Sequence, residues 1–212
     1  MASPRLASTR SARLRYSPTD QRISLPAMSE APAMMRGMED LVERLEQLDS
    51  LLADATESAL SSGMLGSLSN DRLLEAIAAA SRISRRAEAL LIESTSQVED
   101  RSDIGVPREA RLTTMLGCAS TTEVIQRATG LSSRSAKNLR AAGRAIVQRV
   151  ALSSGETLPA EFPAMRAALI SGHVGVDGLL AVTGPLAHLV GTAGRAAHAA
   201  ADEELARSAR GG

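Results

Sequence analysis

The stretch RLLEAIAAASRISRRAEALLIE, residues 72–93, decides the fold class of this chain. Its apolar residues recur at steps of three and four, which places them on one side of an α-helix. The members of this stripe are Leu73, Ala76, Ala80, Ile83, Ala87 and Leu90. Ser69 or Asn70 can cap the helix start, and Asp71 in the first turn interacts favourably with the helix dipole. The pattern predicts a long helix that ends near Arg101.

The composition also favours a helical protein. Hydrophobic residues make up 44% of the 212 residues but aromatic residues only 1%, so the core must be built from Ala, Leu, Ile, Val and Met. Ala, Leu and Met are good helix formers, while the mixture of β-branched and aromatic residues typical of strands is thin. We therefore predict an all-α fold.

Another helix is predicted upstream, because a second apolar stripe keeps the same steps. Its members are Leu41, Leu45, Leu48, Leu52, Ala55 and Ala59. The other faces are acidic, with seven Asp or Glu residues between 39 and 57 against only Arg44. The Gly- and Ser-rich segment SSGMLGSLSN, residues 61–70, then breaks the helix. Two long helices with near-heptad stripes predict an antiparallel hairpin over 37–104, or equally a homodimer through 38–101.

Residues 1–36 are predicted to be a disordered, basic N-terminal segment, because they are rich in Arg, Ser and Pro and show no periodicity. This composition is typical of a transit peptide, but a start codon placed too far upstream explains it as well. No secretory signal is visible, and the most apolar late stretch, 174–193, carries groups that are costly in a bilayer. The single cysteine, Cys118, excludes an internal disulfide and suits a reducing compartment. We expect a cytoplasmic protein that does not enter a membrane.

Shorter helices are predicted after Gly105 and Pro107, in a bundle over residues 105–208. We expect one helix near 107–117, a closely spaced pair within 120–149, and one near 161–171 that ends at Gly172. One or two helices rich in Gly and Ala should follow, to about residue 208. Residues 37–208 are expected to form one domain.

The pair is predicted by STTEVIQRATGLSSRSAKNLR, residues 120–140. Ser120 can accept from the Glu123 N–H while Glu123 accepts from the Ser120 N–H, a capping box that starts a helix. Gly130 stands where a helix ends in the left-handed conformation, and Ser132 can cap the next helix. A short turn between two short helices is the geometry of a helix-turn-helix. A structural turn inside a helical bundle explains the same pattern.

The formal net charge of zero conceals a basic segment. Residues 121–150 contain six Arg or Lys residues and a single acidic residue, Glu123. A helix with such an excess of positive charge is what phosphate binding requires. If the second helix of the pair entered a major groove, the residues nearest the base edges would be Ser133, Arg134, Lys137 and Asn138. Candidate contacts to the DNA backbone would be Arg140, Arg144 and Arg149. We therefore predict DNA as a partner.

No pattern of catalytic or metal-binding residues is visible. The three histidines are too few and too dispersed for a metal cluster, and although His198 and Asp202 can share a helix face, two groups do not make a zinc site. The spaced glycines of 172–178 lack the preceding strand and the following GK[ST] of a phosphate-binding loop. We expect no catalytic residue, no metal, no cofactor and no small-molecule ligand.

The order of these elements resembles the actinobacterial 13E12-repeat family, whose N-terminal region is classed as a domain of unknown function, number 222. The resemblance covers roughly residues 38–200. It is carried by MEDLVERLEQLDSLL (38–52), the stretch 72–93, VIQRATGLSSRSAKNLRAAGRAI (124–146) and LPAEFPAMRAALISGHVGVDGLLAV (158–182).

In that family a C-terminal HNH nuclease domain usually follows, in which histidines and a metal ion cut DNA. This sequence has no Cys-rich, His-rich or DH-type segment after residue 200, so none of the family's catalytic residues maps onto it. The resemblance implies a nuclease-associated helical domain that positions DNA without a catalytic site, either as a truncated member or as a stand-alone module. The alternative is a helical module for protein–protein interaction or oligomerisation.

Overall fold

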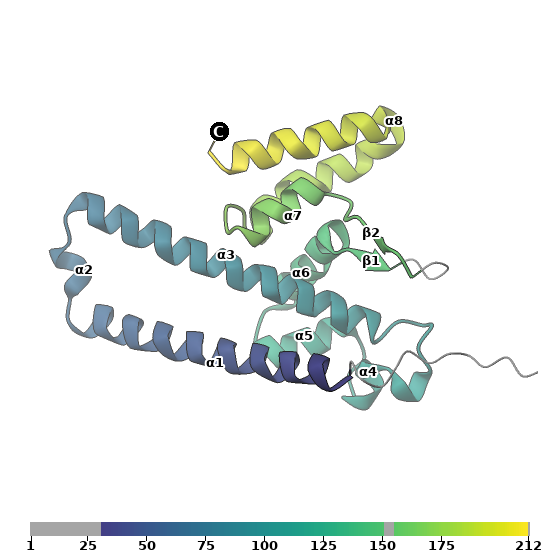
Figure 1. The fold of residues 1–212 in the computed structure, drawn as a ribbon, viewed down its shortest axis with the longest axis horizontal. Coiled ribbons are helices and arrows are strands. Elements are labelled where there is room, and N and C mark those ends of the chain that lie inside the picture. The colour runs from purple at the N-terminus through teal and green to yellow at the C-terminus, as the bar shows by residue number, and fades with distance from the viewer. Residues whose placement is uncertain (1–30, 151–154, 212) are drawn as a thin grey trace, which may run out of the picture. The chain divides into compact units, whose positions relative to one another are not determined.

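The computed structural model describes residues 31–150 and 155–211, so the disorder expected for residues 1–30 lies outside the described part of the chain. The described residues form eight α-helices and one 3-10 helix, which confirms the all-α prediction. In chain order these are α1 (Ala31–Ser61), α2 (Met64–Ser67), α3 (Asn70–Asp100), η1 (Arg108–Ala110), α4 (Leu112–Met115), α5 (Thr121–Thr129), α6 (Ser133–Ile146), α7 (Pro163–Ile170) and α8 (Val176–Ala209) (Figure 1). None of the described helices is both long and apolar enough to cross a membrane.

The chain divides into two compact units, Met1–Ser67 and Leu68–Gly212. α1 and α2 belong to the first unit, and α3 with all later elements belongs to the second. Both long helices of the predicted hairpin are present. Their pairing with each other stays a prediction.

In the first unit, α1 begins at Ala31, inside the segment 1–36 whose disorder stays a prediction. Ala and Met in this segment favour a helix, and Pro32 stands in the first turn, where no backbone N–H is needed. The helix ends in the predicted Gly- and Ser-rich segment, where the Ser61 hydroxyl donates to the Glu57 carbonyl and Gly63 adopts a φ of +63°. α2 is a single helical turn within that segment.

In the second unit, α3 starts and ends as predicted. The Ser69 Oγ accepts a hydrogen bond from the Arg72 N–H, and the last helical residue is Asp100. α3 contacts α5, α6, α7 and α8, and in Figure 1 it runs between α5 on one side and α7 on the other. Ile92 on α3 is fully buried. This helix is therefore the central element of the second unit.

The core of the second unit lies where α3, α6, α7 and α8 meet. Its largest fully buried side chains include Phe162, Ile146, Met165 and Leu169. α8 is kinked at Gly194, whose φ of +77° and ψ of 161° are not helical, and its second half folds back beside α7 (Figure 1). This arrangement agrees with the expectation of one or two Gly- and Ala-rich helices at the end of the bundle.

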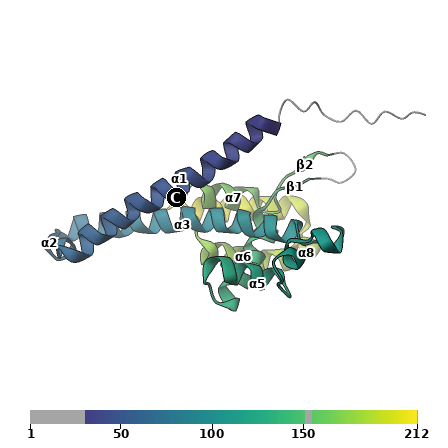
Figure 2. The same ribbon diagram turned by 90° about the horizontal axis from the view of Figure 1, so that it is seen from below.

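Two local expectations differ from the structure. The helix expected over 107–117 is replaced by η1 and α4, because Arg111 between them is extended and its guanidinium donates to the carbonyls of Ile104 and Val106. Two short strands that the sequence did not predict, β1 (Arg149–Val150) and β2 (Thr157–Leu158), pair antiparallel with Arg149 opposite Leu158. They form an arm that projects from the helices of the second unit (Figure 2).

Candidate nucleic-acid interface

The predicted helix start at Ser120 is present, with one change in its hydrogen bonds. The Ser120 Oγ accepts from the Glu123 N–H at 3.2 Å, as predicted. The Glu123 carboxylate accepts from the Ala119 N–H at 2.7 Å, one residue before the predicted donor. This N–H lowers the pKa of Glu123 below the usual range, and Arg127 lowers it further against partial desolvation.

The turn between α5 and α6 has the predicted conformation. Gly130 is left-handed, with a φ of +70°, and its N–H donates to the Gln126 carbonyl at 2.8 Å. A side chain at this position would be strained, because L-residues other than Gly rarely adopt a positive φ. The Ser132 Oγ then accepts from the Ser135 N–H at 3.1 Å and starts α6. The helix-turn-helix-like pair is therefore formed by local signals that the sequence contains.

One side of α6 is buried against α3. Ala136 and Ala142 are fully buried, and Gly143 lies so close to α3 that an added Cβ would stand 2.4 Å from the Ser96 Oγ. Small residues at these positions let the two helix backbones approach each other. This packing determines which side of α6 faces α3 and which side remains exposed.

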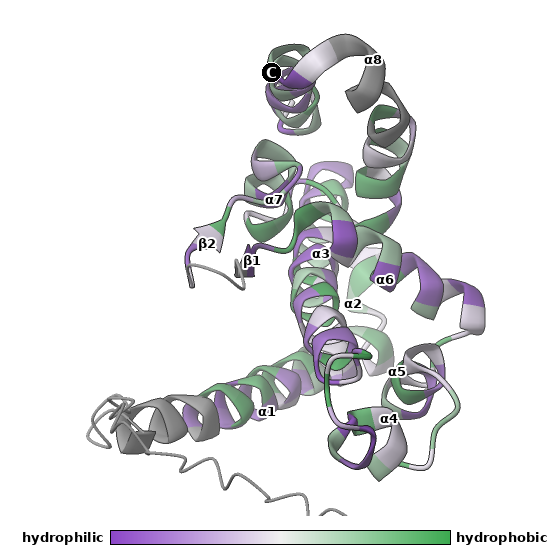
Figure 3. Ribbon diagram, turned by 90° about the vertical axis from the view of Figure 1, so that its right-hand side faces the viewer, coloured by the Kyte–Doolittle hydropathy of each residue, from purple (hydrophilic) through white to green (hydrophobic). Residues whose placement is uncertain are grey.

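The opposite side of α6 is exposed and basic. Arg134, Lys137 and Arg144 are exposed at helical spacing, and Ser133 is exposed at the start of the same helix. Hydrophilic residues, purple in Figure 3, recur along α6. Neither the Arg134 side chain nor the Lys137 side chain forms a hydrogen bond or ion pair with another residue that the structure describes. We call Ser133, Arg134, Lys137 and Arg144 the basic face of α6.

Arg140 lies at the edge of this face and is already bound. Its Nε donates to the Glu99 Oε1 at 2.6 Å and its Nη1 to the Thr122 Oγ1 at 2.9 Å. Glu99 also accepts from Arg144 Nη2, at a longer 3.4 Å. The Arg140 side chain is 25% exposed and that of Arg144 is 62% exposed. Arg140 therefore joins α3, α5 and α6, while Arg144 remains accessible to a ligand.

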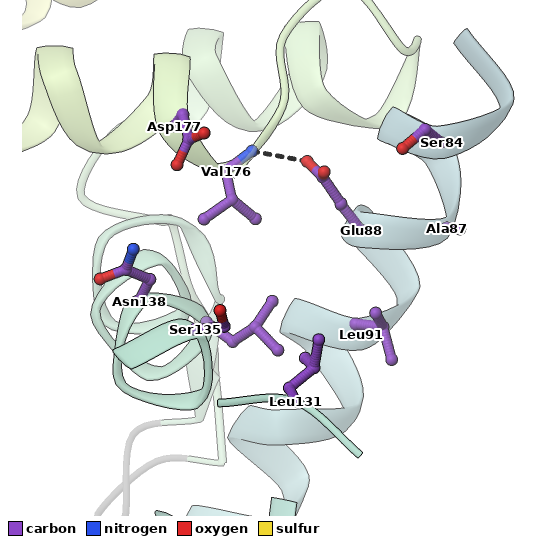
Figure 4. A pocket seen from close by; sticks show the side chains of 10 residues that line it. Ser84, Ala87, Glu88, Leu91, Leu131, Ser135, Asn138, Val176 and Asp177 are labelled. Carbon is purple, nitrogen blue, oxygen red and sulfur yellow. Dashed lines mark hydrogen bonds between the residues drawn. The ribbon is translucent and has the colours of Figure 1, made fainter. Parts of the chain in front are cut away.

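Asn138 lies apart from the basic face. It is half-buried and lines a groove of about 380 Å³ between α3, α6 and the start of α8. In Figure 4 it stands across the groove from α3, near Asp177. On the α3 side, Glu88 accepts a hydrogen bond from the Val176 N–H at 2.7 Å and so caps α8. This carboxylate has a structural partner.

Basic side chains continue beyond the C-terminal end of α6. Arg144 and Arg149 line a shallow cleft of about 210 Å³ together with Leu158, Pro159 and Glu161. Arg149, a predicted contact to the DNA backbone, is exposed on β1. The cleft extends the positive surface from α6 to the projecting arm.

The structure gives His198 and Asp202 separate contacts within the helical bundle. The Asp202 carboxylate is 1% exposed and accepts from the Ala164 and Met165 N–H groups at 2.7 and 3.0 Å, while the His198 ring lies 4.5 Å from that of Phe162. No group of three His, Cys, Asp or Glu side chains in the described part of the chain could hold a metal ion.

Of the predicted site residues, the structure brings Ser133, Arg134, Lys137 and Arg144 onto one exposed face. It places Asn138 in a neighbouring groove and binds Arg140 to Glu99. The prediction missed Glu99 and Thr122 as partners of Arg140. Glu99 is 41 residues away in the chain, and no local spacing indicates such a pair.

Comparison of this chain with family models, with curated proteins and with solved structures found no match.

Proposed function

We propose that the second unit binds double-stranded DNA through the basic face of α6, as a helical module without a catalytic site of its own. The observation that supports this most is the exposure of Arg134 and Lys137, unpaired within the described chain, on a helix that α3 holds in place. The resemblance to a nuclease-associated family supports the proposal by analogy.

The charge and position of these side chains suit a phosphate backbone. A Lys or Arg that neutralises a phosphate releases condensed counterions, so affinity falls as the salt concentration rises. Ser133, Arg134 and Lys137 stand in the first turns of α6, the part of a recognition helix that reaches base edges in a major groove. Arg134 could form a bidentate contact with guanine there, while Arg144 contacts phosphate.

The proposal is tested by fluorescence anisotropy with a random 20 to 30 base-pair duplex over a series of salt concentrations. We expect the double variant Arg134→Ala, Lys137→Ala to bind at least about tenfold more weakly at low salt. The slope of log K against log salt should fall by roughly one for Lys137, and by roughly two if Arg134 contacts phosphate on the random duplex. A matched control is Arg207→Ala, Arg210→Ala, which removes the same charge from exposed positions at the end of α8. The control should retain most of the affinity.

Equal losses in the two double variants would show only that net charge matters and would overturn the assignment to α6. Binding that does not change with salt would also contradict the proposal. Both double variants change exposed residues, so far-ultraviolet circular dichroism should show an unchanged fold.

A further inference from the structure

A second surface, on α1, is apolar and is not covered by any described element of its own unit. We assign heptad positions a to Leu45, Leu52 and Ala59, and positions d to Leu41, Leu48 and Ala55. The four leucines are between 38% and 61% exposed. The only other described element of the first unit is the single turn of α2, so among the described residues of that unit nothing covers the stripe.

The acidic residues of α1 avoid this stripe. Within the part of α1 whose side chains are described, five of the six carboxylates occupy the outward positions b, c and f, and these are Asp40, Glu43, Glu46, Asp54 and Glu57. Positions e and g, which flank the seam of a coiled coil, hold Val42, Asp49 and Thr56, and Arg44, Leu51 and Ser58. Asp49 is therefore the only acidic residue and Arg44 the only basic residue beside the stripe. Two such helices can approach each other without repulsion between like charges.

We propose that α1 pairs with α1 of a second copy of this chain as a parallel, in-register coiled coil. In that arrangement each g residue faces the e residue of the next heptad on the partner helix, so Arg44 meets Asp49 of the second copy. An antiparallel pair brings g against g and e against e, and then Arg44 meets no acidic residue. The charges thus select both the partner and its direction.

Arg44 is available for this contact. Its guanidinium lies 2.8 Å from Asp40 on its own helix, and the two side chains are 69% and 50% exposed. A surface pair of this kind contributes little, so it does not compete strongly with a second acceptor. The proposed pairing does not depend on DNA binding by the second unit.

Sedimentation equilibrium of the full chain tests the proposal. We expect a reversible dimer whose dissociation constant rises at least tenfold in Leu48→Glu, because a carboxylate would be buried at a d position. The matched control is Ser50→Glu, the same charge at an outward f position, which should leave the constant within about twofold. A monomer at all concentrations, or a dimer that Leu48→Glu does not weaken, would overturn the proposal.

Charge exchange tests the direction. Arg44→Glu and Asp49→Arg should each weaken the homodimer, whereas an equimolar mixture of the two should dimerise more tightly than either alone, because every g to e contact then joins opposite charges. In a Cys118→Ser background, Leu41→Cys should form an intermolecular disulfide on oxidation, since only parallel, in-register helices bring this position beside itself. A dimer that neither recovers on mixing nor crosslinks would exclude this arrangement.

Discussion

Glu99 on α3 determines which cations of α6 are available. It holds Arg140 in a half-buried ion pair and lies within 3.4 Å of Arg144, while Arg134 and Lys137 lie beyond its hydrogen-bonding reach. The excess of basic over acidic residues counted between 121 and 150 therefore overstates the positive charge of this surface. One carboxylate from outside that segment neutralises part of it.

Replacing the Glu99 carboxylate should change the stability of the fold and the affinity for DNA in opposite directions. Glu99→Gln loses the charge-assisted bonds to Arg140 and should lower the free energy of unfolding by about 1 to 2 kcal/mol. The same change frees positive charge beside the basic face, so DNA affinity at low salt should rise on the order of two- to fivefold. Urea denaturation and fluorescence anisotropy measure the two effects.

Glu93→Gln serves as the control for that change, because Glu93 on the same helix pairs with Arg166 of α7 rather than with α6. It should leave DNA affinity within about twofold. If Glu99→Gln weakened DNA binding while the fold stayed intact, the basic face would not be the binding surface.

The residue scale also shows where sequence reasoning stops. The period of a helix explains why Arg134, Lys137 and Arg144 lie on one exposed side of α6. It could not distinguish Arg140, whose environment is set by Glu99 and Thr122 from other helices. A partner distant in the chain leaves no local pattern.

At the scale of elements, the helix caps are of two kinds: some are made by residues next to the helix in the chain, and others by residues distant in the chain. The caps at Ser69, Ser120 and Ser132 are local; the sequence predicted Ser120 and Ser132, and gave Ser69 as one of two candidates. α7 and α8 are capped by residues distant in the chain, because the Asp202 carboxylate accepts from the start of α7 and the Glu88 carboxylate accepts from the start of α8. Phe162 at the cap position of α7 offers no side-chain acceptor, so the buried carboxylate replaces it.

This long-range cap predicts that removing the Asp202 carboxylate destabilises the fold strongly, whereas removing that of the neighbouring Glu203 has little effect. Asp202→Ala leaves the N–H groups of Ala164 and Met165 without their acceptor in a buried site and should lower the free energy of unfolding by about 2 to 3 kcal/mol. Asp202→Asn keeps one acceptor oxygen and should cost less. Urea denaturation followed by circular dichroism measures both variants.

The neighbouring Glu203 is exposed, so Glu203→Ala should change stability by no more than about 0.5 kcal/mol. Similar losses in Asp202→Ala and Glu203→Ala would mean that helix propensity, and not the cap of α7, explains the effect. That result would contradict the assignment of Asp202 as the cap of α7.

At the scale of the whole molecule, the two units differ in how they are stabilised. The second unit has a core of buried residues from α3, α6, α7 and α8, whereas the described leucines of α1 are exposed. An isolated helix is only marginally stable in water, because most helical stability in proteins comes from packing of an apolar face. The persistence of α1 in solution therefore depends on what covers its stripe.

Hydrogen exchange at several protein concentrations identifies that cover. Backbone amides of α6 should be strongly protected at every concentration, because opening them requires disruption of the core. If α1 pairs with a second copy, protection of residues 41–59 should be weak in dilute protein and increase with concentration, and Leu48→Glu should abolish the increase. Strong protection of these amides that does not change with concentration would mean that α1 is covered by its own chain, as the predicted hairpin requires, and the proposed coiled coil would then be wrong.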